Sequence, residues 1–159
     1  MPAWRARGAS SGFTLVELLV VMVIIGITLG LATLNAIPSP RQDLENEARR
    51  IALLLQLARD EAIVRNRLVA FEANGERYRF MVRGDTGWEP VTRDDLLRER
   101  SFKNPPLRLV LEPSGTGGPD MLRITFGREP VDRPFVLTLA SGANAVAIRA
   151  DGVGHFTVE

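Results

Sequence analysis

The most apolar stretch of the chain lies near its N-terminus and carries a single charge. Residues 13–34 comprise 22 residues, of which only Glu17 is charged. As an α-helix rising about 1.5 Å per residue, this stretch would be about 33 Å long, and the apolar core of a bilayer is about 30 Å thick. The pattern therefore predicts a transmembrane helix over residues 13–34. Because a carboxylate is unfavourable in such a helix, we expect Glu17 to have a function.

A Pro-rich segment separates this helix from a second, amphipathic helix. We expect residues 35–40 to kink or break the helix, because two prolines disfavour the helical backbone there. Ser39 followed by Pro40 and Gln42 predicts a new helix start with a capping box. Apolar residues then recur every three or four positions, which predicts a helix over residues 41–66. Its apolar face consists of Leu44, Ala48, Ile51, Leu55, Ala58 and Ala62.

After residue 66 the apolar positions alternate with a period of two, which is typical of β-strands. Residues 68–72 and 77–82 flank Asn74-Gly75 and predict a β-hairpin. The less regular residues 84–106 predict a surface excursion. Five further strands are expected, at residues 107–111, 121–126, 135–139, 145–149 and 154–158.

Together these patterns predict an α+β fold, in which the N-terminal helix packs on a small antiparallel β-sandwich of about seven strands. The expected organisation is a leader at residues 1–12, the transmembrane helix at 13–34, the Pro-rich segment at 35–40 and a domain at 41–159. Within that domain the helix covers 41–66 and the strands cover 68–159. The chain has no cysteine, so its core alone must hold the fold.

The charge distribution predicts both the orientation and the class of partner. Arg5 and Arg7 precede the transmembrane helix and no acidic residue accompanies them, so the N-terminus is expected to stay in the cytoplasm. The chain would then cross the membrane once. If the cell is a bacterium with two membranes, this is the inner membrane and the C-terminal domain lies in the periplasm. Over the whole chain, 20 basic residues face 19 acidic ones, and the two signs are interspersed. Nucleic-acid binding is therefore not expected.

The hexapeptide Gly12-Phe13-Thr14-Leu15-Val16-Glu17 resembles the prepilin processing motif of type IV pilins and of type II secretion pseudopilins. The resemblance implies a pilin-like fold. It also implies that a prepilin peptidase cuts between Gly12 and Phe13 and that the new N-terminus at Phe13 is methylated. Glu17 would then be an assembly residue that contacts a neighbouring subunit.

Simple electrostatics agrees with a function for Glu17 in assembly. A free amine at Phe13 is cationic, and Glu17 lies one helical turn further along. The two charges could neutralise each other within one subunit or between neighbours, and the resemblance favours the pairing between subunits. Two other interpretations of the segment remain. A secretory signal peptide would have a shorter, uncharged apolar run, and a simple uncleaved anchor would leave Glu17 unexplained.

Two further stretches, Leu57–Arg67 and Ala150–Gly154, resemble the GspH/FimT subfamily of minor pseudopilins and minor pilins. The resemblance implies a GspH-like minor pseudopilin at or near the tip of the periplasmic pseudopilus that drives protein export. The alternative is a FimT/FimU-like minor pilin involved in fibre initiation, adhesion or DNA uptake. We favour the secretion branch because the chain lacks cysteines and an excess of basic residues. The implied partners are prepilin peptidase, other major and minor pseudopilins, and inner-membrane lipid.

No pattern in the sequence predicts an enzyme, a cofactor or a metal site. His155 is the only histidine, and the alternation around it places it in the last strand as a surface or half-buried residue. The glycines at 115–118 lack the Lys-Ser/Thr and the helix of a phosphate-binding loop. An anchored periplasmic enzyme therefore remains a hypothesis without a site.

Overall fold

The computed structural model describes residues 14–34, 39–92, 94–114, 121–129 and 131–159. The chain forms two compact units, Met1–Pro38 and Ser39–Glu159. In the first unit, helix α1 runs from Leu15 to Leu34. Over the residues that the structure describes, no helix combines the length and the apolar character needed to cross a membrane. Within the predicted Pro-rich segment, residues 35–38 lie outside the described residues.

Helix α2 (Pro40–Val64) begins with the predicted capping box. The Ser39 hydroxyl accepts the Gln42 N–H at 3.2 Å, and the Gln42 side-chain oxygen accepts the Ser39 N–H at 3.4 Å. The sequence predicted a helix that continues to residue 66, and this end was wrong by two residues. Asn66 adopts a left-handed backbone with φ of 52°, a conformation that a helix cannot contain but that asparagine tolerates.

The nine strands in the described residues form two antiparallel sheets. In the first sheet the order is β3 (Trp88–Pro90), β2 (Arg77–Arg83), β1 (Val69–Ala73) and β6 (Leu122–Phe126), with β4 (Arg100–Ser101) also paired to β2. In the second sheet the order is β5 (Arg108–Glu112), β7 (Phe135–Ser141), β8 (Asn144–Ala150) and β9 (Phe156–Val158). The predicted α+β fold with antiparallel sheets is confirmed.

The number of strands differs from the prediction of about seven. Strands β3 and β4 lie inside residues 84–106, which the sequence predicted to be a surface excursion. They contain three and two residues, and an alternating pattern cannot be recognised over so short a length. Their pairing with β2 gives this segment a fixed place on the first sheet.

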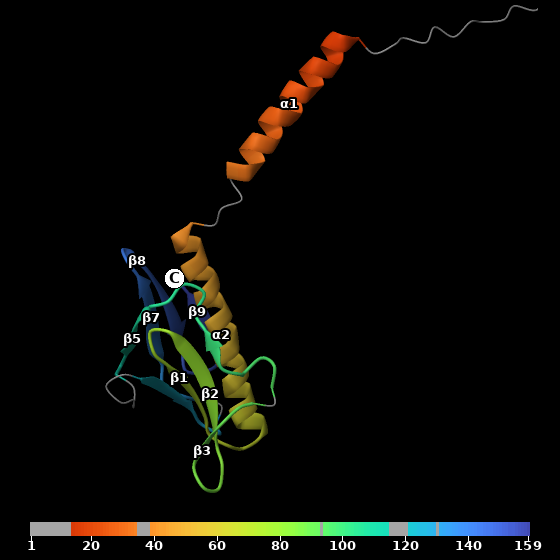
Figure 1. Cartoon of the computed structure of the whole chain (residues 1–159). Coiled ribbons are helices and arrows are strands. Elements are labelled where there is room, and N and C mark those ends of the chain that lie inside the picture. Colours follow the sequence, from red (N-terminus) through yellow and green to blue (C-terminus); the bar gives the residue numbers. More distant parts are fainter. Residues whose placement is uncertain (1–13, 35–38, 93, 115–120, 130) are drawn as a thin grey trace, which may run out of the picture. The chain divides into compact units, whose positions relative to one another are not determined.

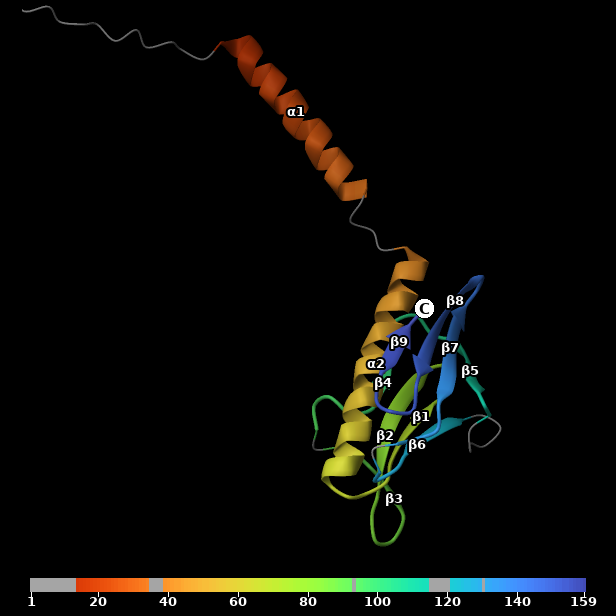
Figure 2. The same ribbon diagram turned by 180° about the vertical axis from the view of Figure 1, so that it is seen from behind.

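Helix α2 packs against strands of both sheets and supplies the centre of the core (Figures 1 and 2). Every member of its predicted apolar face is buried, and Ile51 and Leu55 are completely inaccessible to solvent. Facing the helix, the first sheet contributes an aromatic cluster of Phe71, Tyr78 and Phe80. The helix therefore links two sheets that share one hydrophobic core.

Strand β1 is buried on both of its faces. Val69, Phe71 and Ala73 belong to the core, whereas Ala70 and Glu72 alternate with them and belong to the opposite face of the sheet. A carboxylate thus lies on the face of the first sheet that points away from the core, yet Glu72 is only 1% exposed. Neighbouring side chains on that face must cover it.

Candidate processing and assembly site

Thr14 starts helix α1 and fixes the position of Glu17. The Thr14 carbonyl accepts the Leu18 N–H at 3.2 Å, and the Thr14 hydroxyl accepts the Glu17 N–H at 3.2 Å. This is the hydrogen bonding of a helix N-cap. Glu17 therefore lies in the first turn, where the helix dipole favours a negative charge.

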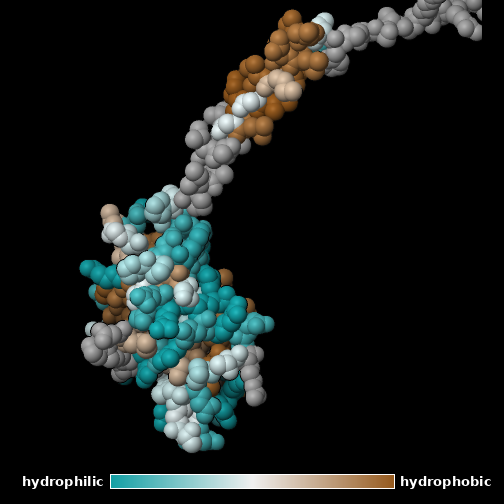
Figure 3. All heavy atoms as spheres, viewed as in Figure 1, coloured by the Kyte–Doolittle hydropathy of each residue, from teal (hydrophilic) through white to brown (hydrophobic). Residues whose placement is uncertain are grey.

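Apolar side chains surround Glu17 on the helix surface. From Leu15 to Leu29 the large apolar residues of α1 are between 41% and 76% exposed, and they form the apolar helix surface seen in Figure 3. The sequence from residue 14 to residue 34 has no basic side chain, so α1 itself offers no cation to Glu17. Gly12 and Phe13, the predicted cleavage site, lie outside the described residues.

The rest of α1 has features of a helix that packs against other helices. The Thr28 hydroxyl donates to the carbonyls of Ile24 at 2.9 Å and Ile25 at 3.0 Å, so this polar group is satisfied within the helix. Gly26 and Gly30 lie one turn apart, and a Cβ atom at either position would meet nothing within 4 Å. Two glycines at this spacing allow another helix to approach the backbone closely.

In the second unit, the outward face of the first sheet carries a charge cluster. Arg79 on β2 donates from Nε to Glu72 at 2.8 Å, and Arg123 on β6 donates from Nε to the other carboxylate oxygen at 2.8 Å and also from Nη2. Burial alone would raise the pKa of Glu72. The hydrogen bonds from the two arginines outweigh this effect and hold the pKa below its usual value.

Trp88 on β3 lies on the same face. It pairs directly with Arg83 on β2, and Arg83 lies on the same side of β2 as Arg79, which pairs with Glu72. The guanidinium carbons of Arg83 and Arg123 lie 5.8 Å and 5.5 Å from the centre of the Trp88 ring. Both distances are typical of cation–π contacts. We call Glu72, Arg79, Arg83, Trp88 and Arg123 the Arg–Trp face.

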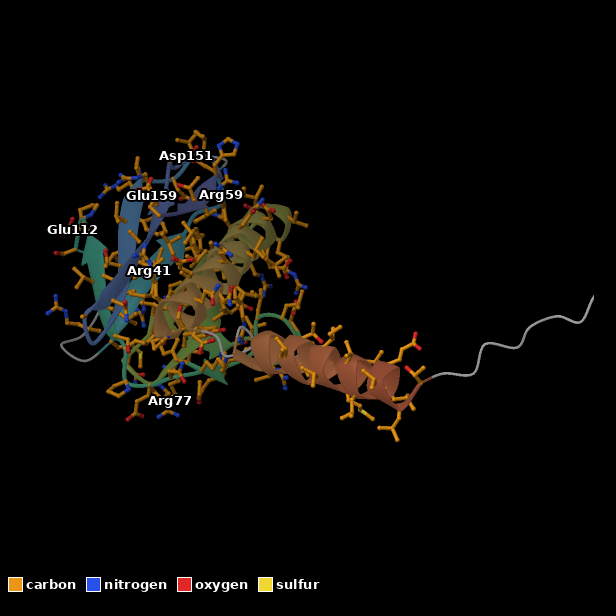
Figure 4. All side chains as sticks on the ribbon, turned by 90° about the horizontal axis from the view of Figure 1, so that it is seen from above. Arg41, Arg59, Arg77, Glu112, Asp151 and Glu159 are labelled. Atoms are coloured by element: carbon orange, nitrogen blue, oxygen red, sulfur yellow. The ribbon has the colours of Figure 1, made fainter. Side chains whose placement is uncertain are left out.

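The two stretches that resemble the GspH/FimT subfamily contact each other in the fold. Arg59, in the first stretch, is largely buried, and a Cβ atom added to Gly154, in the second stretch, would lie 2.6 Å from Arg59 Nη1. Asp132 also approaches Arg59, with 4.0 Å between Oδ2 and Nε. Figure 4 labels Arg59 in the first stretch and Asp151 in the second. The absence of a side chain at Gly154 is therefore what makes room for the guanidinium.

His155 lies outside the strand in which the sequence placed it. Strand β9 starts at Phe156, and the His155 side chain is exposed, with its Nδ1 atom 2.6 Å from Asp151 Oδ2. Asp151 Oδ1 also accepts the N–H groups of Val153 and His155. The bond to His155 lowers the pKa of Asp151 to about 2. Because this carboxylate stabilises the turn before β9, the strand begins two residues later than expected.

Sequence reasoning missed the roles of Glu72, Arg79, Arg83, Trp88 and Arg123. The one available signal was Glu72, a charge inside an otherwise apolar predicted strand. Its two arginine partners lie 7 and 51 residues away, and no local pattern connects them. Within the described ranges, no group of three or more His, Cys, Asp or Glu residues is arranged to hold a metal ion.

Two protein families match this chain. The family described as Type II transport protein GspH matches residues 47–154, and the Prokaryotic N-terminal methylation motif matches residues 7–33. The first match runs from residue 47, within α2, to the turn before β9. The second includes Gly12, Phe13 and Glu17.

Individual relatives agree with the family matches. Type II secretion system protein H of Pseudomonas aeruginosa is 35% identical over 91% of this chain and 92% of its own length. Protein H of Aeromonas hydrophila is 34% identical over 57% of this chain and 51% of its own length.

Solved structures share the fold. The minor pseudopilin EpsH of the Vibrio cholerae type 2 secretion system superposes with a TM-score of 0.58 at 16% identity, covering 74% of this chain and 96% of EpsH. The solution structure of Escherichia coli GspH gives a TM-score of 0.57 at 20% identity, covering 77% of this chain and 95% of GspH. With its family match and its Pseudomonas relative, this chain belongs to the GspH family of minor pseudopilins of type II secretion.

Proposed function

We propose that this minor pseudopilin is cut after Gly12, methylated on Phe13 and assembled at or near the tip of a periplasmic pseudopilus through Glu17. In this proposal, prepilin peptidase removes residues 1–12, and the remaining apolar segment holds the protein in the inner membrane. The domain from Ser39 onward lies in the periplasm. Other major and minor pseudopilins are its partners, and its work is structural rather than enzymatic.

The position of Glu17 carries the proposal. It is the only charge among the 22 residues from 13 to 34, and α1 contains no basic residue that could pair with it. The Thr14 cap holds Glu17 in the first turn, where its side chain is exposed. A cationic amine at Phe13 of a neighbouring subunit would neutralise this carboxylate where water is excluded, and each charge would lower the cost of burying the other.

The match to the N-terminal methylation motif supports the processing step, because it spans both sides of the proposed cut. The family membership supports the secretion pseudopilus over a type IV pilus. The close helix approach available at Gly26 and Gly30 supports packing of α1 within a fibre.

The processing step is tested by mass spectrometry of the protein purified from cells that express a prepilin peptidase. We expect an N-terminus at methylated Phe13 in the unchanged chain and no cleavage in Gly12→Leu. Gly8→Leu is the matched control, because it places the same bulk four residues before the cut, and it should be processed normally. A new N-terminus beyond residue 36 would instead identify a secretory signal peptide and would refute the proposal.

The assembly step is tested with Glu17→Val and Glu17→Asp. Glu17→Val makes the segment more apolar, so membrane insertion and cleavage should be retained. Crosslinking to other pseudopilins and secretion should both fall in Glu17→Val and be at least partly retained in Glu17→Asp, which keeps the charge. Full crosslinking and full secretion in Glu17→Val would show that Glu17 makes no assembly contact.

A further inference from the structure

The Arg–Trp face has the composition of a protein-binding surface. Its five side chains come from four strands of the first sheet, and the sheet holds them in register. Arginine and tryptophan are enriched among the residues that dominate binding energies at protein interfaces. Trp88 and Arg123 are partly exposed and Arg83 is exposed, so these three side chains are accessible to a partner.

The buried carboxylate of Glu72 holds this surface in place. Its two oxygens bind Arg79 and Arg123 from opposite neighbouring strands, so these two long side chains are fixed without a ligand. Arg123 in turn contacts the ring of Trp88. A buried ion pair adds little to stability compared with apolar packing, whereas fixed side chains reduce the entropy that is lost on binding. The arrangement is therefore better suited to recognition than to stability.

The net positive charge of the Arg–Trp face indicates that its partner is acidic. The face holds three guanidinium groups and one carboxylate, which Arg79 and Arg123 share, so its five side chains carry a surplus of two positive charges. Among the described residues, Arg83 forms no ion pair, and its guanidinium lies over the Trp88 ring. A guanidinium presents several N–H donors in a plane and binds carboxylates through two of them at once. The free donors of this face therefore match carboxylates.

The spacing of the arginines indicates that the partner segment is extended. Arg79 and Arg83 lie on the same side of β2, four residues apart, which places their Cα atoms about 13 Å from each other. Two acidic residues four positions apart in an extended peptide have the same separation. A nucleic acid would need a longer track of cations, because its affinity depends on neutralising many phosphates.

We propose that the Arg–Trp face binds an extended, acidic segment of a partner protein. Carboxylates of the segment pair with Arg83 and with the free donors of Arg79, and the neighbouring chain of the segment packs on Trp88. The proposal does not depend on processing at Gly12 or on Glu17.

The test uses the full-length chain in detergent with Trp4→Phe, which makes Trp88 the only tryptophan. The probe is the dye-labelled peptide Glu-Ser-Glu-Ser-Glu, and its binding is followed by fluorescence anisotropy and by the emission of Trp88. We expect saturable binding and a change in Trp88 emission. Arg83→Gln and Trp88→Leu should each weaken binding about fivefold or more, as expected for loss of one charged or cation–π contact.

Matched controls separate this site from general electrostatic attraction. Arg108→Gln removes an exposed arginine from β5 in the other sheet and changes the net charge equally, so it should weaken binding less than about twofold. The peptide Gln-Ser-Gln-Ser-Gln should not bind. Equal weakening by Arg108→Gln and Arg83→Gln, or no binding of the acidic peptide at millimolar concentration, would overturn the proposal. Tighter binding of oligothymidylate or of phosphatidylglycerol vesicles than of the acidic peptide would also overturn it.

Discussion

The substitution Gly152→Ala tests how closely the turn between β8 and β9 packs on the segment before β7. Gly152 has φ of 84°, and a Cβ atom there would lie 2.4 Å from the carbonyl oxygen of Asp132 and 3.2 Å from the nitrogen of Pro134. The Gly152 carbonyl also accepts the Asp132 N–H at 2.7 Å, so the two backbones cannot separate without losing this bond. The added methyl group would therefore meet backbone atoms and the Pro134 ring, which cannot rotate away as a flexible side chain could.

Two costs combine in this variant. A left-handed backbone costs a non-glycine residue about 1–2 kcal/mol. Forcing an extra methyl group into a packed site costs about 1–3 kcal/mol more. We therefore expect Gly152→Ala to lower the free energy of unfolding by about 2–5 kcal/mol.

Two other glycines separate the contributions. Gly142 has φ of 57° but an open environment, so Gly142→Ala should show only the backbone cost, about 1–2 kcal/mol. Gly87 has neither a positive φ nor a neighbour within 4 Å, so Gly87→Ala should change stability by less than about 0.5 kcal/mol.

The measurement is urea denaturation of residues 39–159, followed by Trp88 fluorescence and far-ultraviolet circular dichroism. The fragment starts at Ser39 so that it keeps the cap of α2. If Gly152→Ala proved no less stable than Gly142→Ala, the close approach of the Gly152 and Asp132 backbones would be wrong.

Three further predictions concern α2 in the same fragment, each read from its denaturation curve. Ile51→Asp places an unpaired charge in the core and should lower the free energy of unfolding by about 4 kcal/mol or more. Leu53→Asp, at a position 68% exposed on the same helix, should change it by about 0.5 kcal/mol or less. Similar values for both variants would contradict the core assignment. Ser39→Ala removes the cap and should cost about 1 kcal/mol, and no loss would show that the capping box does not contribute. Burial raises the pKa of Glu47, although the attraction of Arg50 opposes this shift. Ionised Glu47 therefore destabilises the folded state as the pH rises above about 4.5. Glu47→Gln should be more stable than the unchanged domain by about 1 kcal/mol at pH 7, and this difference should vanish below about pH 4. An advantage that is constant with pH would mean that the charge of Glu47 is not its cause.

The elements that the sequence predicted well are those with local signals. The capping box around Ser39 and the apolar face of α2 depend on residues within a few positions of each other, and both are confirmed. The β1–β2 hairpin follows from alternation and from Asn74, whose side chain accepts the N–H groups of Glu76 and Arg77 in the turn. Local energetics and the final fold agree at these places.

The features that the sequence did not predict depend on distant pairs. The burial of Glu72 requires Arg123, and the position of the Arg59 guanidinium requires the absence of a side chain at Gly154. Strands β3 and β4 are strands only because β2 offers them hydrogen bonds. The proposed assembly residue could be identified from the sequence because Glu17 is a charge in an apolar segment. Apart from Glu72, the residues of the Arg–Trp face each look like ordinary surface residues, because only the folded sheet brings them together.

The order in which the chain visits the two sheets has a consequence for proteolysis. Strands β1 to β4 build the first sheet, β5 joins the second, β6 returns to the first, and β7 to β9 complete the second. A protease that cuts one crossing, such as the link from β4 to β5, leaves each sheet joined to the other by the remaining crossings and by α2. Neither sheet can open alone as a sub-global unit, so cleavage in the interior of the domain should require its complete unfolding. A nicked domain would then stay assembled.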